Sequence, residues 1–189
     1  MSTKSFLSAT FRKRVDHEAG RHRASRAPAE PLFCDSCGAV YRNRRWMTRD
    51  AALALGIQLE PDKSKSAPAH AEKQVLCPGC KSVRAGTPSG FVYLDGEFVV
   101  KHRAEIERLL ANEAERAEVD NPTAKIMKTS WSKKGVASKK GVARRLTVTT
   151  TTEHLAKRLG EALEKAFSGE VRYDFSHENK LARVYWHRD

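Results

Sequence analysis

The four cysteines of the chain form two Cys-x-x-Cys pairs, and this arrangement constrains the fold more than any other feature. The first pair is Cys34 and Cys37, and the second is Cys77 and Cys80. Two intervening residues let both thiolates of a pair reach one metal ion from a tight turn, and two such turns complete a tetrahedral shell of four sulfurs. The sequence therefore predicts a zinc ribbon with one structural Zn²⁺ bound by all four cysteines.

Three other uses of these cysteines compete with zinc. Disulfide bonds need an oxidising compartment, and the polar, basic start of the chain lacks the apolar segment of a secretory signal. A redox Cys-x-x-Cys typically opens a helix, and we expect neither pair to do so. Iron suits the same four-thiolate shell, so the choice between zinc and iron stays open. Four protein ligands close the shell, so the metal is predicted to hold the fold together and not to activate water.

The segment between the two pairs is longer than in a compact ribbon. We expect an insertion at about residues 48–73, in which Thr48 caps a short helix that ends at Gly56. Farther along, Asp95 and Gly96 stand between two apolar runs, and this dipeptide favours a tight β-hairpin. We place that hairpin beneath the metal site, as a ribbon requires.

The rest of the chain predicts an α+β fold. The expected elements are a helix over 101–118, a short strand over 125–128, a strand over 146–149, a helix that ends near Gly169, and strands over 171–175 and 181–186. Thr150 and Glu153 form a capping box for the second of these helices. The order from residue 146 onward predicts a small mixed β-α-β-β layer, with helices on one face of the sheet.

These elements divide the chain into three regions. Residues 1–31 are predicted to be a basic, disordered arm, residues 32–100 a zinc-ribbon module, and residues 101–189 an α+β module. The last module includes a basic loop over 132–145. Within that loop Ser-Lys-Lys-Gly-Val-Ala occurs twice in succession, and the glycine of each repeat disfavours a packed helix, so the loop is predicted to be mobile.

The net charge of +12 is concentrated in two of these segments. Residues 1–31 hold seven basic and three acidic residues, which gives +4, and residues 132–145 hold six basic and no acidic residues, which gives +6. The remaining residues include 22 basic and 20 acidic ones and are nearly neutral. Clustered Lys and Arg displace the counterions of a phosphate backbone, which favours a nucleic-acid partner; a solubilising role is the alternative.

Two groups of residues are candidates for nucleic-acid contact. The predicted contacts are Arg42, Arg44, Arg45 and Trp46 beside the first cysteine pair, and Lys133, Lys134, Lys139, Lys140, Arg144 and Arg145 in the basic loop. In the tail, Arg172, Arg183, Tyr185 and His187 alternate along the strands. That alternation favours either a basic, aromatic face for single-stranded RNA or ordinary solvated strand positions.

Several function classes lack their sequence signals. There is no Gly-rich phosphate loop, no dinucleotide fingerprint and no Gly-x-Ser-x-Gly elbow, so we expect a protein that is not an enzyme. No apolar stretch approaches the roughly 20 residues of a spanning helix, so we expect no membrane partner. Without a secretory signal the expected location is the cytoplasm.

The two cysteine motifs also carry a resemblance to a known family. Phe33-Cys-Asp-Ser-Cys-Gly and Val75-Leu-Cys-Pro-Gly-Cys, with the hairpin and helix that follow, resemble the N-terminal zinc-binding part of the large-ribosomal-subunit export adaptor family of archaea and eukaryotes. The tail from Leu146 onward is similar to short bacterial proteins grouped with that family. The resemblance covers about residues 32–131 and 146–189. Export adaptors have further Cys-x-x-Cys pairs and β-rich domains, for which this chain has no room.

The resemblance implies contact with ribosomal or other structured RNA and carries over the four cysteines as zinc ligands. Together with the charge distribution, it predicts a non-enzymatic, zinc-stabilised RNA-binding protein that associates with ribosomes or ribosomal subunits, with ribosomal proteins as further partners. A DNA-binding regulator built on a zinc ribbon and a protein–protein adaptor are the alternatives. The sequence leaves the oligomeric state open.

Overall fold

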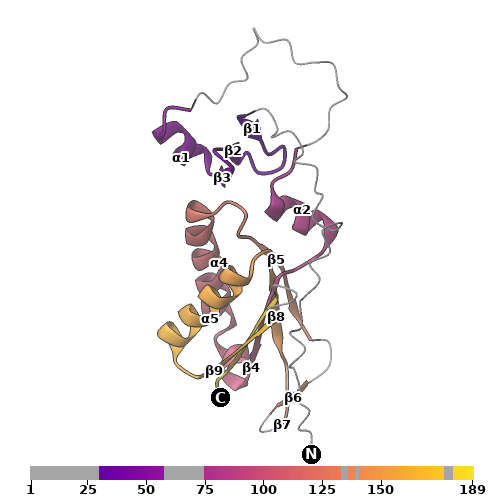
Figure 1. Cartoon of the computed structure of the whole chain (residues 1–189). Helices are drawn as coiled ribbons and strands as arrows, with labels where there is room; N and C mark the ends of the chain where they lie inside the picture. The colour runs from indigo at the N-terminus through magenta and orange to yellow at the C-terminus, as the bar shows by residue number, and fades with distance from the viewer. Residues whose placement is uncertain (1–29, 58–74, 133–135, 139–140, 177–180) are drawn as a thin grey trace, which may run out of the picture.

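The computed structural model describes residues 30–57, 75–132, 136–138, 141–176 and 181–189 (Figure 1). Most of the predicted arm lies outside these residues, as does the later part of the predicted insertion. No helix among the described residues combines the length and the apolar character needed to cross a membrane.

A five-stranded sheet forms the body of the molecule, with strand order β5-β8-β4-β10-β9. Its strands are β4 (Gly90–Asp95), β5 (Ile126–Trp131), β8 (Leu146–Thr150), β9 (Glu170–Ser176) and β10 (Leu181–His187). The two central strands β4 and β10 are parallel, and all other neighbours are antiparallel. Alternating burial along β4, β8 and β10 shows that one face of the sheet points into the core.

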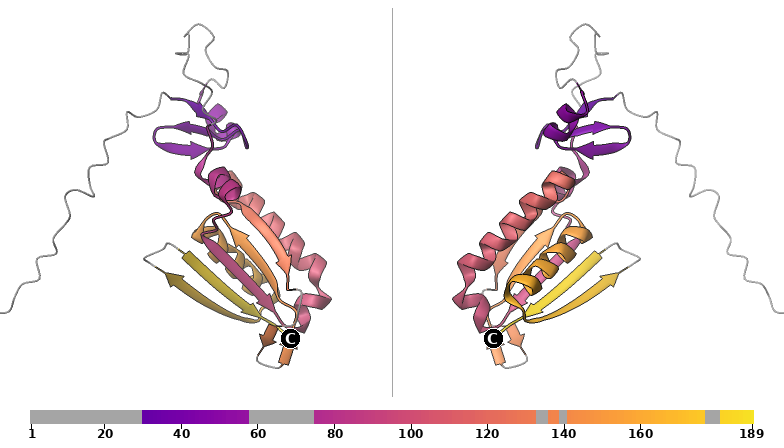
Figure 2. Two further views of the ribbon diagram at one scale, coloured as in Figure 1. Left: turned by 90° about the vertical axis from the view of Figure 1, so that its right-hand side faces the viewer. Right: turned by 90° about the vertical axis from the view of Figure 1, so that its left-hand side faces the viewer.

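Among the described residues, the helices that pack on the sheet cover only that buried face (Figure 2). They are α3 (Glu97–Lys101), α4 (Arg103–Asp120) and α5 (Glu153–Phe167). Leu155, Leu159 and Leu163 of α5 are fully buried against strand residues such as Val184 and Trp186. The helix approaches the sheet closely at Gly160, where a Cβ atom would lie 2.6 Å from Val184 Cγ1.

The smaller part of the molecule contains the first cysteine pair and lies beyond one end of the sheet (Figure 1). It consists of a three-stranded antiparallel sheet and one helix, namely β1 (Leu32–Phe33), β2 (Val40–Arg42), β3 (Arg45–Met47) and α1 (Arg49–Ala54). Thr48 caps α1 as predicted, because its Oγ1 accepts a hydrogen bond from Ala51 N at 3.3 Å. Helix α2 (Pro78–Ala85) connects this part to the body.

The hairpin predicted at Asp95 and Gly96 is wrong. β4 ends at Asp95, and the next residues form α3. Both edges of β4 already pair with β8 and β10, so no edge is free for a hairpin partner. Gly96 serves another purpose: it has φ +113, and a Cβ atom there would lie 1.9 Å from the backbone oxygen of Arg188, so the C-terminal backbone passes directly over it.

The hairpin of the small sheet is instead formed by β2 and β3. Asn43 and Arg44 connect these strands with φ values of 51° and 61°, the positive sign that both central residues of a type I′ turn require. This hairpin lies within the cysteine-containing part, where the ribbon prediction needs one, but it comes from a segment about 50 residues earlier than predicted.

The remaining elements confirm the predicted α+β fold, with shifted boundaries. The helix predicted over 101–118 is α4 with the short α3 before it, and the strand predicted over 125–128 extends to Trp131. The capping box at Thr150 is wrong, because Thr150 is a buried strand residue. Thr152 caps α5 instead, and its Oγ1 accepts a hydrogen bond from Leu155 N at 3.3 Å.

The basic segment 132–145 contains regular structure. β6 (Val136–Ser138) and β7 (Gly141–Ala143) pair as an antiparallel ribbon between β5 and β8. The prediction of a loop is therefore wrong for these six residues, which pair as strands. Figure 1 shows the ribbon at the end of the molecule opposite the small sheet.

Candidate metal centre and basic surfaces

The structure brings all four cysteines into one cluster, although the two pairs are 40 residues apart in sequence. Their Sγ atoms lie within 4.8 Å of one another, and the Sγ atoms of Cys37 and Cys77 are 3.7 Å apart. All four are free thiols. Cys34, Cys77 and Cys80 are buried, whereas Cys37 is the most exposed of the four.

The first knuckle is a tight turn between β1 and β2. Gly38 N donates to Cys34 O at 2.8 Å, and Cys34 N donates to Ala39 O at 2.8 Å, which closes the turn over both sulfurs. Gly38 has φ +70, a conformation that favours glycine. The turn is joined to the second knuckle through Asp35, whose backbone N donates to Val75 O and whose carboxylate accepts from Val75 N at 2.7 Å.

The second knuckle is the start of helix α2. Cys77 is the N-cap, Pro78 occupies the first turn, and the Cys77 Sγ accepts a hydrogen bond from Cys80 N at 3.4 Å. This placement corrects our expectation that neither cysteine pair opens a helix. The redox interpretation gains little from it, because the sulfurs of the other pair lie in the same cluster and all four thiols share one site.

Backbone amides around the cluster stabilise negative charge on sulfur. Burial opposes the ionisation of Cys34, but the backbone N–H groups of Cys77, Cys37 and Ser36 outweigh it and lower the pKa of the Cys34 thiol to about 6. Burial raises the pKa of the Cys77 thiol, as it does for Cys37. Four thiolates at this spacing therefore require a cation among them.

The donor set and its spacing fit a metal ion. A metal–sulfur bond of about 2.3 Å places the sulfurs of a regular tetrahedron roughly 3.8 Å apart, close to the separation of Cys37 and Cys77. Four thiolates suit zinc and iron–sulfur chemistry and exclude the hard cations, which prefer oxygen. Cys34, Cys37, Cys77 and Cys80 are thus a possible metal site with a complete protein shell.

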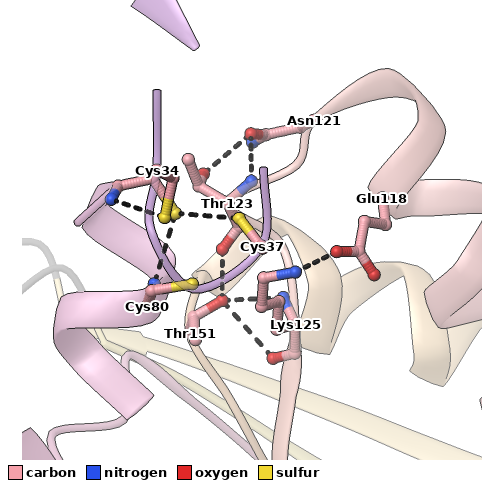
Figure 3. Close-up of polar contacts among 9 residues, drawn as sticks. Cys34, Cys37, Cys80, Glu118, Asn121, Thr123, Lys125 and Thr151 are labelled. Carbon is pink, nitrogen blue, oxygen red and sulfur yellow. Dashed lines mark hydrogen bonds and ion pairs between the residues drawn. The ribbon is translucent and has the colours of Figure 1, made fainter. Parts of the chain in front are cut away.

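The turn at residues 121–125 supports the cluster from the body (Figure 3). Asn121 Oδ1 accepts hydrogen bonds from the backbone N and the hydroxyl of Thr123, and Thr151 Oγ1 donates to Thr123 O at 2.6 Å. Helix α2 packs directly on this turn, because a Cβ atom on Gly79 would lie 2.4 Å from Thr123 O. The cysteine cluster and the sheet are therefore connected through the main chain of this turn.

Lys125 places a positive charge beside the sulfurs. Burial opposes its charge, but the hydrogen bond and the negative charge of Glu118 raise the pKa of Lys125, and the thiolates of Cys37 and Cys80 add to this effect. A metal ion of charge +2 with four thiolates carries a net charge of −2, which the ammonium partly neutralises. Sequence reasoning missed Lys125, because it lies far from both cysteine pairs along the chain.

The structure places the predicted basic residues of the small sheet at its hairpin turn. Arg42, Arg44 and Arg45 are exposed there. Trp46 is half-buried, packs against the cysteine cluster, and has its ring centroid 5.3 Å from that of Tyr41. Its side chain therefore supports the small sheet, and the three arginines form the outward surface.

The predicted basic residues of segment 132–145 divide into two groups. Lys133, Lys134, Lys139 and Lys140 lie outside the described residues. Arg144 is exposed, with its guanidinium 5.8 Å from the Trp131 ring centroid, and Arg145 donates to Asp95 Oδ2 at 3.0 Å. Arg145, the last residue of the segment, thus binds the segment to strand β4 of the sheet.

The described residues of the two predicted groups do not form one surface. The hairpin arginines lie at one end of the molecule and the basic ribbon at the other (Figure 1). Comparison of the chain with protein-family models, with curated proteins and with solved structures found no match. The resemblance to the export adaptors therefore stays a prediction that rests on the cysteine motifs and the tail.

Proposed function

We propose that the chain is a non-enzymatic RNA-binding protein with a structural zinc ribbon, which associates with ribosomes or ribosomal subunits in the cytoplasm. The observation that carries the proposal is the basic ribbon between β5 and β8. Its segment 132–145 contributes six basic residues and no acidic ones. Arg144 and Arg145 lie where the segment rejoins the sheet, and the four lysines adjoin the paired strands in sequence. Clustered cations of this kind bind a phosphate backbone without a pocket.

The geometry of the cysteine cluster supports a structural role for the metal. Each of the four coordination positions of zinc would be filled by a thiolate, so none is open to water or substrate. The amide donors around Cys34 and the ammonium of Lys125 stabilise such a closed, negatively charged centre. The zinc therefore supplies folding energy for the small sheet, which presents Arg42, Arg44 and Arg45.

Sedimentation tests the ribosomal partner. Lysate run on a sucrose gradient at low salt should place the protein with the ribosomal subunits, and RNase treatment should move it to the top of the gradient. A protein that stays at the top before RNase treatment would refute the association. Sequencing of RNA crosslinked to the protein in cells would then identify the site.

A charge-removal variant tests the ribbon. Replacing Lys133, Lys134, Lys139 and Lys140 with Gln should reduce the slope of log affinity against log salt by about 3, because each lost phosphate contact removes roughly 0.7–0.9. The matched control replaces four exposed lysines on helices, Lys81, Lys101, Lys157 and Lys165, and loses the same charge. Equal effects of the two variants would show that net charge acts and that the ribbon has no special role.

A further inference from the structure

The five-stranded sheet has one face that no described helix covers. Helices α4 and α5 pack on the opposite face, and Figure 2 (left) shows the uncovered face toward the viewer. Residues of the central strands that alternate with the buried positions lie on it, and all of those on β4 and β10 are half-buried. A sheet face without a helix on it, next to a basic segment, is a candidate binding surface.

Three aromatic rings form a row across the centre of this face. Tyr93 of β4 lies directly opposite Tyr185 of β10, with ring centroids 5.1 Å apart and planes 21° apart. Phe91 lies two residues before Tyr93 on the same face, with the two ring centroids 6.0 Å apart and the ring planes 5° apart. The three rings are therefore nearly parallel. None belongs to the helix-covered core, so their placement here is not explained by the packing of the fold.

Cationic groups border the row. The Arg172 guanidinium lies 4.5 Å from the Tyr185 ring centroid, and that of Arg145 lies 5.7 Å from the Tyr93 centroid. Arg183 lies two residues before Tyr185 on the same strand face, within 3.9 Å of Asp174. Arg172 is exposed, and its guanidinium lies over the Tyr185 ring, so a base that stacks on this ring displaces the guanidinium, which can then contact a phosphate.

The carboxylate that follows Tyr93 on this face is already paired with cationic or hydrogen-bonding groups. Asp95 follows Tyr93 on the same face, and its oxygens accept from Arg145 at 3.0 Å and contact His187 Nδ1 at 2.6 Å. The positions opposite the β4 rings are threonines, with Thr147 beside Tyr93 and Thr149 beside Phe91. The row thus lies among hydroxyls, cations and the ion-paired carboxylates of Asp95 and Asp174, so its cations can also meet a phosphate.

The exposed apolar side chains of the described structure lie elsewhere. The large hydrophobic residues with the greatest exposure are Leu53, Leu55, Val83, Val100, Val119 and Phe175, and none of them faces this side of the sheet. A protein partner would typically bury an exposed apolar centre. The uncovered face offers half-buried rings and cations instead, which favours a nucleic acid.

We propose that this face binds a single-stranded segment of RNA, with bases stacked on Phe91, Tyr93 and Tyr185 and phosphates held by Arg172 and Arg183. The inference rests on the proposed RNA-binding function and adds its binding surface and strand preference. Duplex bases are already stacked on one another and cannot reach the rings, whereas unpaired bases can. Three rings in a row suit about two or three bases.

The basic segment supports the same occupant. It leaves the sheet at Trp131 and returns at Leu146, which pairs with Leu94, the neighbour of Tyr93. Arg145, its last residue, contacts both the Asp95 carboxylate and the Tyr93 ring. A strand bound at Arg145 is therefore adjacent to the aromatic row.

Fluorescence anisotropy with a labelled single strand of about ten nucleotides tests the proposal, with a duplex of equal length as the comparison. Tyr93→Ala and Tyr185→Ala should each weaken single-strand binding about 5- to 150-fold, the effect of losing one stacked base. Tyr93→Phe and Tyr185→Phe should keep nearly full affinity, because the ring is retained. Duplex affinity should change little in all four variants.

Phe175→Ala is the matched control, since it removes an exposed aromatic ring from the opposite side of β9. Arg172→Gln is a second test that leaves the rings in place, and it should weaken single-strand binding several-fold. Photocrosslinking of the wild-type protein, followed by mass spectrometry, needs no variant and should place the RNA on peptides from β4 and β10.

The outcomes separate this inference from the proposed function. Wild-type protein that binds RNA, with no preference for single strands and no effect of folded Tyr93→Ala or Tyr185→Ala variants, would overturn the inference and leave the proposed function standing. Crosslinks found only outside β4, β9 and β10 would do the same. If the wild-type protein binds neither the single strand nor the duplex at low salt, both the inference and the proposed function are overturned.

Discussion

Removal of the metal should unfold the small sheet and leave the five-stranded sheet intact. The reason is that the two parts have separate cores. Buried residues of the small part form two clusters, one around the cysteines and one around Val40, Met47 and Ile57, whereas the sheet and its helices form a third. The perturbation is chelation of the wild-type protein, or Cys77→Ser, which removes a buried ligand.

The magnitude follows from what the small part buries. Its large buried side chains are Val40, Met47 and Ile57, and full burial of each contributes about 1.5–3 kcal/mol, or roughly 5–9 kcal/mol together. A structural zinc ion contributes about 10–16 kcal/mol in small zinc-dependent domains. The metal therefore contributes more than these apolar side chains do, and the small sheet should lose its structure when the metal is removed.

Hydrogen exchange measured by mass spectrometry, with and without chelator, provides the assay. Amides of β2 and β3 should lose protection, while those of β4 and β10 should keep it. Ser36→Ala is the control, because it alters the same knuckle but retains the backbone N–H that serves Cys34. The reasoning is refuted if β2 and β3 stay protected without metal, or if elemental analysis of protein prepared without chelator finds no metal.

Three further variants, one of them with a matched control, test the contacts that join the elements. Gly79→Ala should weaken metal affinity about 10- to 100-fold in a chelator competition, because its Cβ would lie 2.4 Å from Thr123 O and displace α2. Trp186→Phe should lower the free energy of unfolding, measured in urea, by about 2–3 kcal/mol, because it removes a 2.8 Å hydrogen bond and leaves a cavity. Trp131→Phe is its control: the Trp131 Nε1 has no hydrogen-bond partner among the described residues, so this change should lower the same free energy by less than about 1 kcal/mol. Glu113→Gln should lower the free energy of unfolding by about 1 kcal/mol at neutral pH. Burial opposes the ionisation of Glu113, but hydrogen bonds from two arginines outweigh burial and lower the pKa of Glu113. Because the folded pKa is the lower one, the difference between wild type and variant should persist above about pH 4.5 and vanish as the pH falls below it, which unfolding at several pH values would show.

The spacing of the cysteines is enough to predict the candidate metal ligands, but other features of the fold have no such local signal. Two residues between cysteines fix the reach of both sulfurs within a turn, so the sequence suffices for that cluster. The helix at the second knuckle also has local signals, with Pro78 in its first turn and Gly86 just after its end. These two signals place Cys77 at a helix start, and the expectation of a knuckle without a helix overlooks them.

The failed hairpin shows what local signals cannot supply. Asp95 and Gly96 have the composition of a tight turn, but the neighbours of β4 come from about 50 and 90 residues later in the chain. Once β8 and β10 occupy both edges, the dipeptide can only end the strand. The Phe91–Tyr93 row is hidden for the same reason, because its significance depends on Tyr185, which becomes its neighbour only through parallel pairing.

The basic hairpin and the aromatic row lie on parts of the molecule with separate cores, so they should respond differently to metal removal. The hairpin arginines depend on the cysteine cluster and its proposed metal, because the three-stranded sheet that presents them has little core of its own. The ribbon and the aromatic row belong to the five-stranded sheet, which has the large core. If both ends contact RNA, metal removal should weaken binding but keep the preference for single strands, since that preference arises from Tyr93 and Tyr185. Loss of both affinity and preference after chelation would instead place the single-strand site at the metal-dependent end.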